Sequence, residues 1–222
     1  MHARKHPCNK EKFPIERDFY ETNSIQARAF VCKARLYAAR HVSCGDVRLS
    51  APLLRLPRLV ESDPRGPQVL HMLTAHTRLL WKEGEIEVTV ATLSAELETA
   101  LRGAHNAGQV VRGLESAERR LVLEERGLRL ADRKSSVQRG ERVSRLLVLS
   151  DDGAERFYRK VESLLRRHGP RVLAVRLEVG AATLGDLIFG QGRLARLLML
   201  EHKEAVSAVL LAMAGHGMGS YS

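Results

Sequence analysis

The pattern of apolar and polar positions predicts three short helices between residues 68 and 117. Apolar side chains recur at three- and four-residue spacing in each helix, and the first is followed by a short candidate strand at 85–88. Thr89 and Asn106 suit the N-caps of the second and third helices, and Gly103 suits the end of the second. Because each helix is too short to bury its apolar face alone, we expect the three to pack on each other.

The stretch that follows has two interpretations. Alternating apolar runs at 121–123 and 128–130 flank the residues Glu125, Arg126 and Gly127. This pattern is typical of a β-hairpin whose glycine adopts the left-handed conformation. The same apolar positions also fit one longer helix that ends at Gly127. We expect the hairpin, and the long helix is the alternative.

The predicted order of helix, strand, helix, helix and hairpin over residues 69–133 resembles the winged helix-turn-helix superfamily. The run Gln-Val-Val-Arg-Gly-Leu-Glu-Ser-Ala at 109–117 resembles its third helix, and residues 119–132 resemble its wing. The resemblance implies that the third helix contacts base edges and that the wing contacts phosphates of double-stranded DNA. The residues it assigns to base edges are Asn106, Gln109 and Arg112, and those it assigns to phosphates are Arg119, Arg120, Arg126 and Arg129.

A small α/β region is predicted after a polar linker at 134–142. Residues 145–149 form an apolar run typical of a buried strand, and an amphipathic helix capped by Ser150 or Asp151 follows as far as His168. Apolar and polar residues then alternate over 173–179. Strand, helix and strand at this spacing predict a parallel pair with a crossover connection.

The end of this region, residues 184–213, is expected to be largely helical, with a break near Glu201 and His202. The segment 205–214 is apolar almost all the way around a helix, so it should be buried on several sides. We expect a homodimer interface to cover it, and the internal core of the domain is the alternative.

Composition changes the picture at the N-terminal side. Residues 1–68 hold six of the seven prolines, all three cysteines and 13 basic residues against 7 acidic ones. The sequence therefore predicts an α+β protein with a basic, poorly ordered extension at 1–67 and a winged helix-turn-helix domain at 68–133. A small α/β domain at 143–214 and a tail at 215–222 complete the expected organisation.

Candidate catalytic chemistry is sparse. No apolar run is long enough to span a membrane. The spacing of the three cysteines matches no zinc pattern. Their odd number favours a reducing compartment, which we expect to be the cytoplasm. The span 180–185 has the glycine spacing of a phosphate loop, but Asp186 stands where lysine is required. We expect no catalytic residue, metal or cofactor.

The expected function is DNA binding, in a transcriptional regulator whose α/β region dimerises or senses a signal. The net charge of +10 is compatible with an anionic partner. One alternative is a non-catalytic adaptor or scaffold subunit of a larger complex. The other is a nucleic-acid enzyme whose divalent metal would be held by Asp151, Asp152, Glu178 or Asp186.

Overall fold

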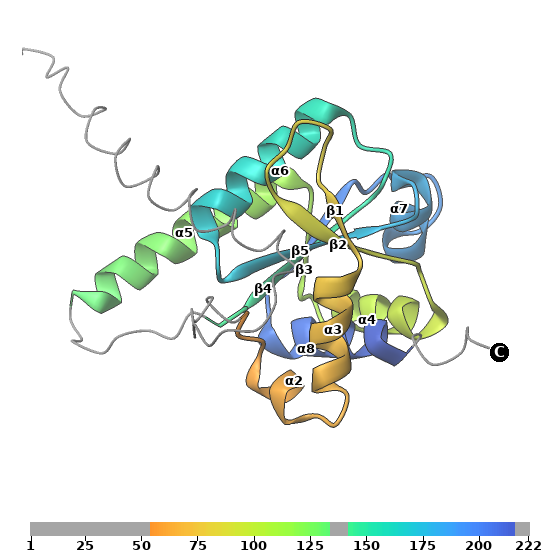
Figure 1. Ribbon diagram of the computed structural model, residues 1–222. Coiled ribbons are helices and arrows are strands. Elements are labelled where there is room, and N and C mark those ends of the chain that lie inside the picture. The colour runs from red at the N-terminus through yellow and green to blue at the C-terminus, as the bar shows by residue number, and fades with distance from the viewer. Residues whose placement is uncertain (1–53, 134–141, 216–222) are drawn as a thin grey trace, which may run out of the picture. The chain divides into compact units, whose positions relative to one another are not determined.

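The computed structural model describes residues 54–133 and 142–215 of the chain (Figure 1). The described residues form seven helices and six strands and belong to one compact unit, residues 51–222. The helices are α2 (Arg58–Ser62), α3 (Gly66–Ala75), α4 (Ala95–Asn106), α5 (Leu114–Asp132), α6 (Glu155–His168), α7 (Ala181–Phe189) and α8 (Lys203–Ala214). The strands are β1 (Thr77–Leu79), β2 (Glu87–Ala91), β3 (Val110–Arg112), β4 (Arg145–Leu149), β5 (Val172–Leu177) and β6 (Leu197–Leu200).

One mixed sheet holds these strands in the order β1-β2-β5-β4-β6-β3, so the described chain is an α+β protein. β2, β5 and β4 are parallel, β1 is antiparallel to β2, and β6 is antiparallel to both β4 and β3. The parallel pair expected from 145–149 and 173–179 is confirmed as β4 and β5. Strands from the expected winged-helix region and from the expected α/β region share this sheet, so the two regions form one folded unit.

Helices cover both faces of the sheet, and the central strand β4 is buried on both sides. Leu146 and Val148 belong to the apolar cluster beneath α3, α4 and α8, whereas Leu147 and Leu149 belong to the cluster beneath α5 and α6. This division follows from the strand geometry, because successive side chains point to opposite faces. Figure 1 shows α3, α4 and α8 on one side of the strands and α5 and α6 on the other.

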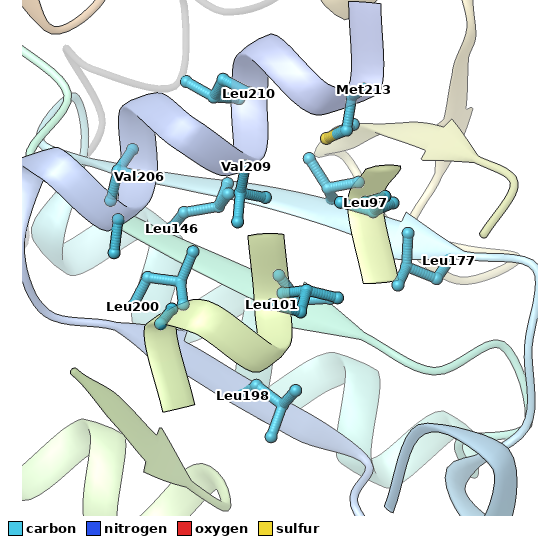
Figure 2. Packing of buried hydrophobic residues seen from close by; sticks show 14 of the residues in the cluster. Leu97, Leu101, Leu146, Leu177, Leu198, Leu200, Val206, Val209, Leu210 and Met213 are labelled. Carbon is cyan, nitrogen blue, oxygen red and sulfur yellow. The ribbon is translucent and has the colours of Figure 1, made fainter. Parts of the chain in front are cut away.

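Helix α8 is buried within the chain itself. Figure 2 shows Val206, Val209 and Leu210 of α8 lying above Leu146 of β4, with Leu101 of α4 beside them. Val206, Val209 and Leu210 each have 0% of their surface exposed. The internal-core alternative for 205–214 is therefore correct, and the expected burial of this segment in a homodimer interface is wrong.

The expected hairpin around Gly127 is also wrong, because α5 runs unbroken through it. Ala117 and Leu121, one helical turn apart, are buried against the sheet, which fixes the first half of α5 as a helix. Leu123 and Leu130 belong to the two alternating runs of the expected hairpin. Both are exposed, so these runs do not form the buried face of a pair of strands. A glycine inside an exposed helix costs only about 1 kcal/mol, and this packing outweighs that cost.

The expected third helix is replaced by a strand and a turn. Val110, Val111 and Arg112 form β3, which pairs with β6 at Leu198 to Leu200. β6 lies within 184–213, a stretch in which the sequence predicts helix. An apolar run of four residues does not distinguish a buried strand from a buried helix, which explains the difference. Without the third helix and the wing, the described residues lack the element order on which the winged-helix resemblance rests.

The N-terminal boundary also differs from expectation. Leu56 and Val60 lie in the apolar core at 3% and 0% exposure, so residues 54–67 belong to the fold rather than to an extension. The rest of the expected extension (1–53), the linker (134–141) and the tail (216–222) lie outside the described residues.

Candidate anion-binding site

One edge of the sheet brings together the ends of several strands. β3 and β4 run in the same direction, because each is antiparallel to β6. Gly113 directly follows β3, Ser150 directly follows β4, and Arg196 directly precedes β6, so all three lie at this edge. In open α/β sheets, ligands bind in the crevice outside the carboxyl ends of the strands.

A cavity of about 520 Å³ lies at this edge, between the beginnings of α5 and α6. We call it the carboxyl-edge cavity. It is lined by Arg112, Gly113, Leu114, Glu115, Ser116, Ala154, Arg156, Phe157, Lys160, Leu194, Ala195, Arg196 and Leu197. Its volume is in the range of small-molecule sites, about 300–1,000 Å³.

The charged residues of the carboxyl-edge cavity are mostly positive. Arg112, Arg156, Lys160 and Arg196 line it, against the single acidic residue Glu115. All five residues are exposed, so their charged groups are accessible from solvent. A concave surface with an excess of one charge concentrates ions of the opposite charge, which here are anions.

Three of these four cations form no ion pair or hydrogen bond within the part of the chain that the structure describes, although the charge of Arg196 helps to lower the pKa of Asp152. The side chains of Arg156, Lys160 and Arg196 form no ion pair or hydrogen bond with residues 54–133 or 142–215. On the same helix α6, by contrast, Arg159 pairs with Glu155 and Arg166 pairs with Glu162. Three of the four cations that line the cavity are thus not engaged in ion pairs, unlike Arg159 and Arg166.

Arg112 is held in place by contacts with neighbouring residues. Its Nη2 donates a hydrogen bond of 2.7 Å to the carbonyl oxygen of Leu194, and its guanidinium lies 5.1 Å from the ring centroid of Phe189. These two contacts use one N–H direction and one face of the guanidinium, which has further N–H groups. Arg112 therefore remains able to bind an anion from a fixed position.

The backbone adds hydrogen-bond donors to the cavity. Gly113 adopts φ +85°, a conformation that favours glycine, and its N–H donates to the carbonyl of Leu197 while the chain turns from β3 into α5. In the described residues, no backbone carbonyl accepts from the N–H groups of Leu114, Glu115 and Ser116, the first turn of α5. Free N–H groups and the helix dipole favour negative charge at such a position.

Two acidic residues that the sequence offers as metal ligands, Asp152 and Asp186, have structural roles. Asp152 Oδ2 accepts a hydrogen bond of 2.9 Å from the N–H of Ala181, at the beginning of α7, and its Oδ1 accepts one of 2.7 Å from the hydroxyl of Ser150. The Ala181 N–H is the main reason that the pKa of Asp152 lies below its usual value. Asp186 accepts from the N–H of Gly192. In the described ranges, no three His, Cys, Asp or Glu residues are grouped so that they could hold a metal ion.

The residues that the sequence assigns to DNA are spread over several elements, and the structure does not bring them into one site. Asn106 ends α4, and the carbonyl of Gln109 accepts from the N–H of Glu201. Arg112 alone of the seven lines the carboxyl-edge cavity. The four arginines assigned to the wing all lie on α5, namely Arg119, Arg120, Arg126 and Arg129.

Three of these four wing arginines have intramolecular partners. Arg120 pairs with Glu201, Arg129 pairs with Glu125, and Arg119 Nε donates to the carbonyl of Glu115 at 3.3 Å. The sequence-based assignment missed Arg156, Lys160 and Arg196. A basic residue at the end or the beginning of a strand, such as Arg112 or Arg196, is the sequence signal that could have indicated these positions.

A second, smaller crevice of about 180 Å³ lies between the middle of α5 and the end of α6. It is lined in part by His168, which is 9% exposed and whose Nε2 has no hydrogen-bond partner in the described structure. Its Nδ1 lies 3.5 Å from a carboxylate oxygen of Glu125. Burial lowers the pKa of His168, and the nearby Glu125 opposes that shift only in part.

Comparison with known proteins places the chain in no family. No family model matches it, and no curated protein matches it. A solved structure described as a protein with unknown function from Bacillus halodurans C is similar over 55% of this chain and 100% of its own length, at 20% identity and a TM-score of 0.37. Among the described helices, none combines the length and the apolar character needed to cross a membrane.

Proposed function

We propose that this chain binds a phosphate-bearing ligand in the carboxyl-edge cavity. The observation that carries the proposal is the grouping of Arg112, Arg156, Lys160 and Arg196 around one cavity, whose described lining holds a single carboxylate. Three of the four form no ion pair or hydrogen bond among the described residues, so their charged groups are able to bind an anion, and Asp152 offsets only part of the charge of Arg196.

Phosphate matches the donors that line the cavity. Guanidinium groups form paired hydrogen bonds with two phosphate oxygens, and a lysine ammonium adds a compact positive charge. The N–H groups at the beginning of α5 and the hydroxyl of Ser116 supply neutral donors on the same side. A phosphate group has enough acceptor oxygens to use several of these donors at once.

DNA binding by a transcriptional regulator is the narrower form of this proposal. A duplex or a single strand would present phosphate to the cavity, and the net charge of +10 would favour its approach. Support now comes from the carboxyl-edge cavity, since most of the α5 arginines are engaged with residues of the same chain.

Binding of inorganic pyrophosphate to the full-length chain, followed by calorimetry, tests the proposal. The variant R156A/K160A should bind at least about tenfold more weakly, because a hydrogen bond to a charged group contributes about 1.5–3 kcal/mol. R58A/R102A is the matched control, since it removes two exposed positive charges from α2 and α4, outside the cavity. Equal affinities in the two double variants, or no binding by the wild type, would refute the proposal.

A labelled DNA duplex and a labelled single strand, measured at two salt concentrations, test the narrower form. If DNA is the ligand, R156A/K160A should weaken binding more than R58A/R102A and should reduce the salt dependence. If both variants lost the same amount of affinity for DNA, binding would depend only on the net charge of the chain. That result would contradict DNA binding through this cavity.

A scaffold or adaptor role is the second candidate, and the exposed part of α5 supports it. Leu123 and Leu130 lie seven positions apart on α5 with 63% and 51% of their surface exposed. Residues at this spacing share one face of a helix, and an exposed apolar face is a feature of contact surfaces.

Sedimentation velocity of the wild type and of L123S/L130S tests whether the chain associates with itself through this face of α5. Loss of a dimer in the variant would support the role, and a monomer in both would contradict self-association through α5.

A further inference from the structure

The carboxyl-edge cavity has an apolar part as well as a charged part. Leu114, Phe157, Leu194 and Leu197 line it together with the basic residues. Leu194 lies three residues before the buried strand β6 and has 56% of its surface exposed. Leu197 is buried, but a bare phosphate ion would leave the exposed surfaces of Leu114, Phe157 and Leu194 in water, so the lining fits a larger ligand with an apolar portion.

Phe157 is held in position by neighbouring residues. Its ring lies edge-to-face on Tyr158, with centroids 5.2 Å apart and an interplanar angle of 63°. The Tyr158 hydroxyl donates to the carbonyl of Ser150 at 2.8 Å and accepts from the N–H of Gly153 at 3.1 Å, which fixes this side of the cavity. An aromatic ring in a fixed position is a suitable surface for stacking or edge contact with another flat ring.

Arg112 connects the charged and apolar parts. Its guanidinium donates to the carbonyl of Leu194, so the backbone beneath the exposed leucine is attached to one of the cations. Planar guanidinium groups and aromatic rings are the surfaces on which nucleic-acid bases stack, whereas lysine and arginine side chains bind the phosphates. The cavity places both kinds of surface within one volume of about 520 Å³.

We propose that the carboxyl-edge cavity binds a nucleotide, with its phosphates at Arg156, Lys160 and Arg196 and its base against Phe157 and Leu194. This inference rests on the proposed phosphate-binding function and specifies the ligand class. The nucleotide is either free or the phosphorylated end of a nucleic-acid strand, since both present a base and a phosphate together. Among the described residues that line the cavity, Glu115 is the one carboxylate, and it lies at the α5 side.

The test compares ADP, pyrophosphate and adenosine as ligands of the full-length chain by calorimetry. ADP should bind about tenfold more tightly than pyrophosphate, because base stacking adds to the phosphate contacts. L194S should remove most of that difference and leave pyrophosphate binding unchanged, and F157L should act in the same direction. Leu194 is exposed, so L194S tests the inference even if F157L fails to fold.

Each outcome decides between the two proposals. If pyrophosphate binds and ADP binds no more tightly, or if L194S weakens both ligands equally, the nucleotide inference is overturned and phosphate binding stands. If neither ligand binds, the proposed function fails as well. A short strand carrying a 5′-phosphate should compete with ADP if strand ends are recognised, and a strand carrying a 5′-hydroxyl should not. If neither strand competes, free nucleotide is the ligand.

Discussion

Arg120 on α5 donates hydrogen bonds from Nε and Nη2 to the carboxylate of Glu201, the residue that follows β6. The Nη2–Oε2 distance is 3.2 Å. The Glu201 side chain is 12% exposed, whereas that of Arg120 is 61% exposed, so the ion pair lies at the surface with its acidic member largely covered. Glu201 raises the pKa of Arg120 and attaches the first half of α5 to the sheet.

The first prediction concerns this ion pair. R120A should leave the affinity for pyrophosphate unchanged, because Arg120 is already paired and does not line the carboxyl-edge cavity. It should lower Tm slightly, and the loss should shrink as salt is added, since exposed ion pairs are weak and screened. Thermal unfolding at two salt concentrations, with calorimetry of the same samples, provides both readings. A large loss of pyrophosphate affinity in R120A would place the anion site on α5 instead.

The apolar core gives the second prediction. Leu101 of α4 is 0% exposed and belongs to the apolar cluster that α4 and α8 form with the sheet (Figure 2), whereas Leu130 of α5 is 51% exposed. L101A should lower the free energy of unfolding by about 2–5 kcal/mol, and L130A should change it by no more than about 0.5 kcal/mol. Urea denaturation measures both. Similar losses in the two variants would contradict the observed position of α4.

A close backbone approach gives the third prediction. A Cβ at Gly185 in α7 would lie 1.7 Å from the carbonyl oxygen of Arg193, so G185A requires the backbone to move. We expect a loss of about 1–3 kcal/mol or more in the free energy of unfolding. G103A in α4 is the control, because no atom lies within 4 Å of the added Cβ. It should stabilise the protein by up to about 1 kcal/mol. Equal stability of the two variants would refute the close contact.

The fourth prediction is a pH dependence caused by His168. Burial lowers its pKa in the folded state, with Glu125 and Glu118 acting against the shift and Arg167 and Arg171 adding to it. Below the ordinary histidine value of about 6.5, the unfolded chain therefore binds a proton more readily than the folded chain does. The free energy of unfolding should fall as pH drops from about 6.5 toward the folded-state pKa.

The control for this prediction is H168L, which fills the buried position without a titrating group. In this pH range, the free energy of unfolding of H168L should change less with pH than that of the wild type, because the titration of His168 is absent. Denaturant unfolding at a series of pH values measures the difference between the two proteins. Parallel slopes for the wild type and H168L would show that another group causes the pH dependence.

The sequence predicted the elements whose burial follows a simple period. β4 is a continuous apolar run and α6 has a single apolar face, and both were recognised, as was the parallel pairing of β4 with β5. β3 and β6 were missed, because runs of three or four apolar residues become strands only through pairing with distant partners. Glycine favours turns, so the pattern around Gly127 predicts a hairpin, yet helix packing at Ala117 and Leu121 prevails.

The candidate site was harder to predict than the core. Arg112, Arg156 and Arg196 are separated by 40 or more positions, and only the order of strands in the sheet brings them to one edge. In the sequence, Arg156 and Lys160 are indistinguishable from the paired Arg159, since all three lie on polar sides of the same helix. Which basic residue has a partner is a property of the fold.

The location of the bound anion is the most direct test of phosphate binding in the carboxyl-edge cavity. We suggest an amide NMR titration of the full-length chain with pyrophosphate. The expected result is a saturable shift of the signals of Leu114, Glu115, Ser116 and Arg156, with the signals of α4 unchanged. Saturable shifts confined to residues outside the cavity, or non-saturating shifts spread over the basic surface, would contradict binding at this edge of the sheet.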